Sequence, residues 1–324
     1  MLQFFGWRDR SVPLEDVYAR ALTRVEIMDR TPYDAVWLAE HHFSGYSVCP
    51  SVHLMGTHVA ARTDRLRIGT AVTLAAFYHP LRIAEEVALL DVLSDGRVNW
   101  GAGRGFDPRE FEIFGVAPDE SAGRFREAVD VVLAAWQNER LTFKGDHFEF
   151  DGVEVLPKPR QRPHPPSWVA ASSQAAVEWA AGAGHSILMD PHSPHGEIAR
   201  KRRLHRDGLA RAGFETDARR YPTARLIAVA PTDAEAAAIA ERGARWTGAY
   251  IPKQVLASFR SDGRTPELVD HYMDDVIIHG GPERVIDTLK RLEEEATLDD
   301  LLLSPLSEKT FDLFTERVLP HVVD

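Results

Sequence analysis

The feature that most constrains this chain is a regular alternation of short apolar runs with longer amphipathic stretches. The runs are rich in β-branched and aromatic residues, which is typical of buried strands. Eight such runs lie at residues 2–6, 35–39, 66–72, 97–101, 168–171, 187–190, 224–230 and 298–303. The stretches between them place apolar residues at helical spacing, as at Val17, Ala21, Val25 and Met28. A strand followed by a helix, repeated eight times, predicts an α/β fold in the form of an eight-stranded (β/α)8 TIM barrel.

The length of the chain predicts a barrel with insertions. Its 324 residues exceed the roughly 250 of a minimal barrel, so we expect a single domain over residues 1–324. Residues 141–166 predict a hairpin followed by a proline-rich connector, and residues 247–282 predict a long connection around Tyr250, Phe259 and Tyr272. Long connections in compact domains are usually lids or mobile loops, and a tolerated surface insertion is the alternative.

Composition and charge exclude several classes of partner. The net charge of −11 disfavours nucleic acid and anionic membrane surfaces. No apolar stretch approaches the roughly 18 residues that span a bilayer, and the first residues lack the order of a signal peptide. The lone cysteine, Cys49, has no partner for an intrachain disulfide, which indicates a reducing compartment. We therefore expect a soluble cytoplasmic protein.

The apolar run at residues 35–39 stops abruptly at Glu40, His41, His42 and Phe43. Such a run predicts a buried parallel strand, and the carboxyl ends of these strands are where α/β enzymes hold their chemistry. Adjacent histidines diverge on an extended strand, and the chain has no Cys-x-x-Cys or His-Glu-x-x-His motif. We therefore expect an active-site histidine here and no catalytic metal.

Glycines, arginines and serines near other strand ends predict an anion site. Gly101, Gly103 and Gly105 allow close approach of the backbone, and their spacing is not that of a dinucleotide fingerprint. Arg104 projects from this stretch, and a guanidinium among exposed amides suits phosphate. Ser172 and Ser173 precede one expected helix, and Arg124 lies in the first turns of another. These groups belong to different barrel loops, which can converge.

Nine short motifs follow one another along the chain, at residues 36–43, 69–72, 79–80, 84–86, 89–91, 93–97, 101–105, 111–115 and 177–181. In these motifs, taken together and in order, the chain resembles the bacterial luciferase-like flavin-dependent monooxygenases, most closely the catalytic luciferase subunit. The resemblance implies a barrel that binds reduced FMN at the carboxyl ends of its strands. It also implies that reduced flavin from a separate reductase reacts with O2 to give a flavin hydroperoxide, which oxygenates a small organic substrate.

The resemblance also implies roles for individual residues. His41 matches the active-site histidine beside the flavin, Ala71–Val72 matches a non-proline cis peptide against the flavin ring, and Glu40 joins the cofactor site. Arg104, Arg124 and Ser173 match phosphate contacts, with Ser172 offering a backbone amide. The expected substrate-binding residues are Trp7, Phe77, Gly103 and Phe106.

The chain departs from luciferases at two positions. Gly103 stands where they carry a reactive cysteine, which predicts more room by the flavin and casts doubt on light emission. Ala176 replaces a hydroxyl residue expected near the phosphate, which weakens one contact there.

Two alternatives remain open, a deazaflavin-dependent hydride-transfer oxidoreductase on the same barrel and a non-catalytic flavin-binding partner subunit. The retained Glu-His-His-Phe tip and Gly-Arg-Gly sequence favour a catalytic role. Relatives in the resembled family are usually dimers, and residues 51–61 and 80–93 are apolar enough to form a homodimer interface.

Overall fold

The computed structural model describes residues 1–217, 219–262, 267–298 and 300–323. The chain divides into two compact units. The N-terminal unit is Gln3–Ala170, and the C-terminal unit is Ala171–Asp324 together with Met1–Leu2. Strand β1 (Leu2–Gln3) spans the boundary between them.

Parallel strands form the centre of the N-terminal unit. Strand β2 (Ala35–Leu38) pairs with β3 (Arg67–Thr70), β3 pairs with β5 (Val98–Gly103), and β5 pairs with β8 (Ser167–Ala170). The short β4 (Thr73–Leu74) also pairs with β5. All four residues of β2 are buried, as its unbroken apolar run predicts.

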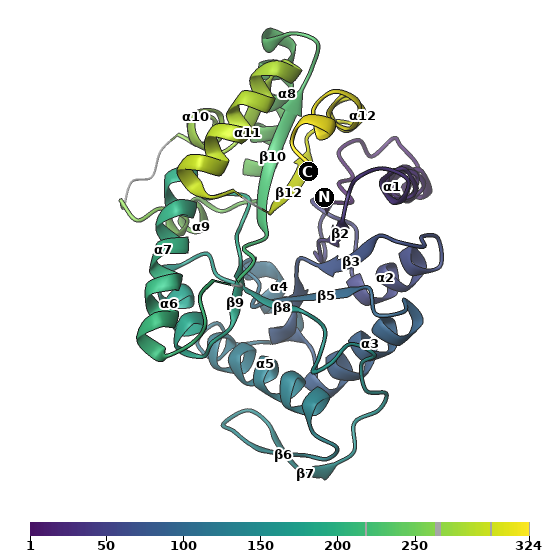
Figure 1. Cartoon of the computed structure of the whole chain (residues 1–324), viewed down its shortest axis with the longest axis vertical. Helices are drawn as coiled ribbons and strands as arrows, with labels where there is room; N and C mark the ends of the chain where they lie inside the picture. The colour runs from purple at the N-terminus through teal and green to yellow at the C-terminus, as the bar shows by residue number, and fades with distance from the viewer. Residues whose placement is uncertain (218, 263–266, 299, 324) are drawn as a thin grey trace. The chain divides into compact units, whose positions relative to one another are not determined.

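Helices cover these strands because each buries an apolar stripe. They are α1 (Leu14–Asp29), α2 (Val52–Ala60), α3 (Pro80–Leu93), α4 (Pro108–Phe114), α5 (Ser121–Gln137) and the 3-10 turn η1 (Ala75–Phe77). Helix α1 buries Val17, Ala21, Val25 and Met28, the stripe expected from the sequence. Figure 1 shows α2 beside β3 and α3 beside β5, and each helix contacts that strand.

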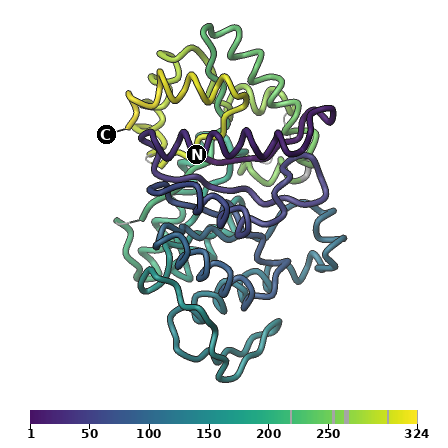
Figure 2. Tube along the Cα trace, turned by 90° about the vertical axis from the view of Figure 1, so that its right-hand side faces the viewer, coloured from purple at the N-terminus to yellow at the C-terminus, as the bar shows by residue number. Residues whose placement is uncertain are grey.

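The hairpin expected after α5 is present. Strands β6 (Leu141–Lys144) and β7 (Glu149–Val153) pair antiparallel and project from the rest of their unit (Figures 1 and 2). The carboxylate of Glu127 on α5 accepts the backbone N–H groups of Asp146, His147 and Phe148 at 2.8, 2.9 and 3.1 Å. The turn of the hairpin is therefore tied to α5.

The C-terminal unit is also built around parallel strands. Strand β10 (Thr223–Val229) lies between β11 (Ile278–Gly280) and β12 (Leu301–Pro305), and β9 (Ser186–Leu188) precedes an isolated bridge from Met189 to Thr223. Figure 1 shows α8 beside β10. The helices are α6 (Gln174–Gly182), α7 (His195–Ala212), α8 (Asp233–Gly248), α9 (Lys253–Ser258), α10 (Leu268–Asp275), α11 (Pro282–Ala296), α12 (Glu308–Arg317) and η2 (Leu319–His321).

The segment at residues 247–282 is not the plain connection that the sequence predicts. Its described part contains α9, α10 and β11, while residues 263–266 lie outside the described residues. Phe259 and Tyr272 are buried, and the Tyr272 hydroxyl lies 3.0 Å from Nδ1 of His192. Buried apolar side chains pack this segment into helices and a strand. The sequence does not predict this, because glycines and charged residues separate those apolar residues.

Each of the eight predicted strands overlaps a strand of the structure, namely β1, β2, β3, β5, β8, β9, β10 and β12. Across the described residues, the helices are too short or too polar to traverse a bilayer.

Candidate active site

The polar tip predicted at the end of β2 lies on an extended stretch just beyond Leu38. Because neighbouring side chains on extended backbone point to opposite sides, the two histidines diverge. The ring of His42 turns to Glu40 and Phe114, whereas the ring of His41 lies among Phe4, Tyr46 and Phe106.

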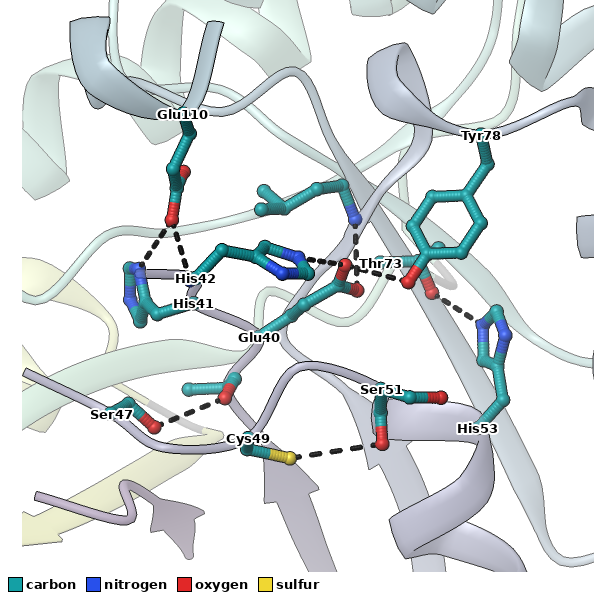
Figure 3. Close-up of polar contacts among 12 residues, drawn as sticks. Glu40, His41, His42, Ser47, Cys49, Ser51, His53, Thr73, Tyr78 and Glu110 are labelled. Atoms are coloured by element: carbon teal, nitrogen blue, oxygen red, sulfur yellow. Dashed lines mark hydrogen bonds and ion pairs between the residues drawn. The ribbon is translucent and has the colours of Figure 1, made fainter. Parts of the chain in front are cut away.

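Glu40 is buried and fully hydrogen-bonded (Figure 3). Its Oε1 accepts the Tyr78 hydroxyl at 2.8 Å and lies 2.9 Å from Nε2 of His42. Its Oε2 accepts the backbone N–H of Leu74 at 3.3 Å. Burial and the nearby carboxylate raise the pKa of Tyr78 above its ordinary range, so the phenol stays a donor. Glu40 thus supports the tip from within the protein.

Glu110, on the seven-residue helix α4, holds both histidines. Its Oε1 accepts the backbone N–H of His42 at 2.8 Å and lies 3.7 Å from Nδ1 of His41 (Figure 3). The contact with His41 is at ion-pair distance and is too long for a hydrogen bond; it favours an orientation in which Nδ1 faces the carboxylate and Nε2 is left for proton exchange.

A cavity of about 400 Å³ opens at this tip. Its size falls within the range of small-molecule sites. The wall combines both histidines of the tip with aromatic rings, hydroxyls and one arginine: Trp7, Arg10, Tyr18, His41, His42, Phe43, Ser44, Ser47, Val48 and Pro50.

Arg104 and Arg124 lie around the start of α5. Arg104 Nη1 donates to Ser121 Oγ at 3.0 Å, and Arg124 Nε donates to the carbonyl of Ala76 at 3.0 Å. Within the described residues, neither guanidinium has a carboxylate partner. Cationic donors left unpaired near a helix N-terminus suit an oxyanion, so these two residues fit the phosphate group expected of a flavin mononucleotide.

Ser172 and Ser173 belong to the C-terminal unit. Ser173 is the N-cap of α6, where its Oγ accepts the backbone N–H of Ala176 at 3.3 Å. The hydroxyl of Ser173 is used by this cap. The first backbone N–H groups of α6 point outward, as they do at helix N-termini that bind anions.

The peptide bond between Ala71 and Val72 is cis, as expected. The glycine at position 103 does not leave the open space that the sequence suggested. A Cβ at position 103 would lie 2.3 Å from Cγ2 of Val72. The Val72 side chain therefore fills the space that a cysteine would take.

The aromatic residues expected near the substrate fall into two groups. Trp7 lines the cavity, and Phe106 meets the His41 ring edge-on with centroids 5.8 Å apart. Phe77 instead packs on Phe111 and Phe114, each with centroids 4.9 Å away. Sequence reasoning missed Arg10, Tyr78 and the role of Glu110, although Glu110 directly precedes the motif at residues 111–115.

In the part of the chain that the structure describes, no group of three or more His, Cys, Asp or Glu side chains is arranged to hold a metal ion.

Comparison with solved structures gives the fold class. A monooxygenase, RslO1, from Streptomyces bottropensis superposes with a TM-score of 0.83 at 28% identity, covering 95% of this chain and 94% of that one. The oxygenating constituent of 3,6-diketocamphane monooxygenase from Pseudomonas putida, in complex with FMN, gives 0.82 at 16% identity over 100% and 98%. The fold is thus the α/β TIM barrel that the strand–helix alternation predicts.

Residues 2–299 match the family model of the luciferase-like monooxygenases, so the chain belongs to that family of oxidoreductases. An uncharacterized protein of Sinorhizobium fredii is 44% identical over 52% of this chain and 50% of its own length. The oxygenase component of a flavin-dependent trigonelline monooxygenase from Acinetobacter baylyi is 31% identical over 55% and 49%. The chain thus spans about half the length of these curated relatives.

Proposed function

We propose that this chain is the oxygenase of a two-component monooxygenase, which takes reduced FMN from a separate reductase and uses O2 to oxygenate a small organic substrate. Membership of the family supports this proposal, as do a relative described as an oxygenase component and a structural neighbour that holds FMN. A cytoplasmic location is part of the proposal, because Cys49 is a free thiol and no other cysteine is present.

The observation that carries the proposal is His41, held by Glu110 in the wall of the cavity. When bound, reduced FMN supplies the electrons that activate O2. The imidazole exchanges a proton at Nε2 with the reacting groups, because an imidazole nitrogen can both donate and accept a proton. Phe4, Tyr46 and Phe106 pack around the ring and leave its side chain only 13% exposed, which limits stray proton transfer from water.

The proposed cofactor site keeps the residues that the family resemblance implies. Arg104 and Arg124 bind the phosphate, because their guanidinium groups have donors without a carboxylate partner among the described residues. Ser172 and Ser173 add amides at the start of α6, and Ala71 and Val72 contact the flavin ring. Glu40 acts indirectly in this scheme, since its oxygens are engaged by Tyr78, His42 and Leu74.

The test compares His41→Ala with the control His58→Ala, which changes an exposed histidine on α2. With a flavin reductase present, compounds are screened for one that lowers the H2O2 released per O2 consumed by the unmodified protein. His41→Ala should then lose at least about 10-fold of the coupled product, release the oxygen as H2O2, and still bind reduced FMN. His58→Ala should behave like the unmodified protein.

Two outcomes would overturn the proposal. Unchanged coupling in His41→Ala would remove His41 from the mechanism. Turnover that requires a reduced deazaflavin and ignores reduced FMN would assign the barrel to hydride transfer.

We also propose that the protein is a homodimer through α2 and α3. These helices expose apolar side chains at Leu54, Leu89, Val92 and Leu93. Leu54 is 75% exposed and Leu93 is 58% exposed, although both lie on helices whose opposite faces are buried. Exposed apolar side chains on two helices that contact each other are typical of a protein interface.

A further inference from the structure

Arg10 is the fixed charge in the wall of the cavity at the β2 tip. The described lining has no carboxylate, and its other polar groups are hydroxyls, an indole and the imidazoles of His41 and His42. An anionic ligand group that enters this cavity therefore meets one guanidinium and no carboxylate in the lining itself, since Glu40 and Glu110 lie behind the two histidines.

The guanidinium of Arg10 is held in place by its neighbours. Its Cζ lies 4.1 Å from the centroid of the Trp7 ring, and the indole Nε1 of Trp7 donates to the carbonyl of Val12 at 2.9 Å. A Cβ at Gly45 would lie 2.7 Å from Arg10 Nη2, so glycine is what lets the arginine approach this loop. The backbone N–H of Trp7 donates to Gly45 at 2.9 Å, which fixes the two segments together. A stacked guanidinium loses little freedom when it binds.

The hydrogen-bond donors of Arg10 are not used within the described residues. The neighbouring carboxylate of Asp9 accepts instead from the backbone and hydroxyl of Ser11, at 2.9 and 2.7 Å. Two hydroxyls of the wall are engaged within the protein: the Tyr18 hydroxyl donates to Val48 at 2.7 Å, and the Ser47 hydroxyl donates to Ala39 at 3.3 Å. Arg10 is thus the strongest donor left for a ligand.

We propose that Arg10 binds the carboxylate of the substrate, and that the substrate class is a small, largely planar carboxylic acid. This inference rests on the proposed function, because it places the acid in the cavity that His41 also lines. A guanidinium and a carboxylate match as two parallel charge-assisted hydrogen bonds. The side chains of Trp7 and Phe43 line the same cavity and supply apolar contact to the carbon skeleton.

A single guanidinium favours a carboxylate over a phosphate monoester. A phosphate monoester carries about two negative charges at neutral pH, and one arginine balances only one of them. The cavity of about 400 Å³ accommodates an aromatic acid of one or two rings.

The experiment measures binding by calorimetry with the full chain and no flavin, so it does not depend on oxygenation. The probes are benzoate, nicotinate and hexanoate, each against its own primary amide, with inorganic phosphate as a further arm. An aromatic acid should bind at least about 10-fold more tightly than its amide, the aromatic acids more tightly than hexanoate, and phosphate more weakly than either.

Variants identify the arginine. Arg10→Gln should lose the preference for acid over amide and still bind the amide, while Arg10→Lys should retain part of it. Arg30→Gln, which removes an exposed charge at the end of α1, is the matched control and should keep the preference. Circular dichroism checks that each variant is folded.

The result that would overturn the inference is equal binding of acid and amide, an unchanged preference in Arg10→Gln, tighter binding of phosphate, or no binding of any acid. If FMN proves not to be the cosubstrate while the acids still bind through Arg10, the proposed function fails and the carboxylate site stands.

Discussion

Glu40 and His42 stand two residues apart on an extended segment, and Oε1 of Glu40 lies 2.9 Å from Nε2 of His42. Residues at this spacing point to the same side of extended backbone, which brings a buried carboxylate and an imidazole together. His41, between them, turns to Glu110. The two neighbouring histidines are therefore held by two different carboxylates, and each imidazole has its own partner.

Glu110→Gln should show whether Glu110 acts on turnover through His41 or only stabilises the fold of the tip. The amide oxygen still accepts the backbone N–H of His42, so we expect little loss of stability. The charge that faces Nδ1 of His41 disappears, so coupled turnover should fall about 10-fold and its pH profile should move. Turnover measured across pH checks this, with FMN affinity as the reference. A pH profile that coincides with that of the unmodified protein would contradict it.

Tyr78→Phe should weaken the N-terminal unit because it removes a donor from a buried carboxylate. The hydroxyl of Tyr78 lies 2.8 Å from Glu40, so we expect a loss of about 1.5–3 kcal/mol in the free energy of unfolding. Urea unfolding of Tyr78→Phe, Glu40→Gln and the double variant gives the coupling between the two groups. Strictly additive losses would show that the contact contributes nothing.

Gly103→Cys should destabilise the protein, because the new side chain enters space that Val72 occupies. A Cβ there lies 2.3 Å from Val72 Cγ2, and overpacking of this kind costs about 1–3 kcal/mol. Adding Val72→Ala should recover part of the loss, since it empties the contested volume. Thermal melting of both variants tests the point, and a fully stable Gly103→Cys would refute it.

The C-terminal unit should lose stability in mild acid because of His205. Burial lowers the pKa of His205 from 6.5 to about 4, so the unfolded chain takes up a proton first as the pH falls. The stability that the neutral ring contributes is complete above pH 6.5 and is lost as the pH falls toward 4. Between these pH values, the free energy of unfolding of His205→Asn should change with pH less steeply than that of the unmodified protein. The difference in slope should be up to about 1.4 kcal/mol per pH unit. If the free energy of unfolding changes with pH in the same way in both proteins, His205 does not cause the loss of stability in acid.

Leu54→Glu with Leu93→Glu should convert the proposed dimer to a monomer. The changes place charges on exposed apolar positions of α2 and α3, where they cannot be buried against a second copy without cost. Sedimentation at micromolar concentration measures the mass. Leu156→Glu, at an exposed leucine in the connector, is the control. A chain that sediments at 36.2 kDa without any substitution would reject the dimer.

The strands and the tip of β2 were predictable because they depend on local patterns. Unbroken apolar runs mark strands buried on both faces, and a charged stop after such a run marks its exposed end. The partners of the tip were not predictable, because Glu110 lies 68 residues beyond His42 and reaches it only through the fold. Arg10 was not predicted for a related reason. A charged residue in a short polar segment usually lies on the solvated surface, and the cavity beside Arg10 is formed only by the fold.

The prediction of open space at Gly103 is wrong because of side-chain packing, which the sequence pattern does not show. A glycine in a sequence shows only that a side chain is missing there. Which neighbour fills that volume depends on how Val72 is placed next to β5, and this is decided by the pairing of distant strands.

Helix α5 carries both an expected cofactor residue and the attachment of the hairpin. Glu127 grips the turn between β6 and β7, and Arg124, nearly one helical turn earlier, lies with its Cζ 5.1 Å from the ring of Phe148 in the same hairpin. The hairpin consequently supports the guanidinium of Arg124, which we assign to the phosphate. Shortening or replacing the hairpin would change how tightly the nucleotide is bound, although no atom of the hairpin needs to touch the nucleotide.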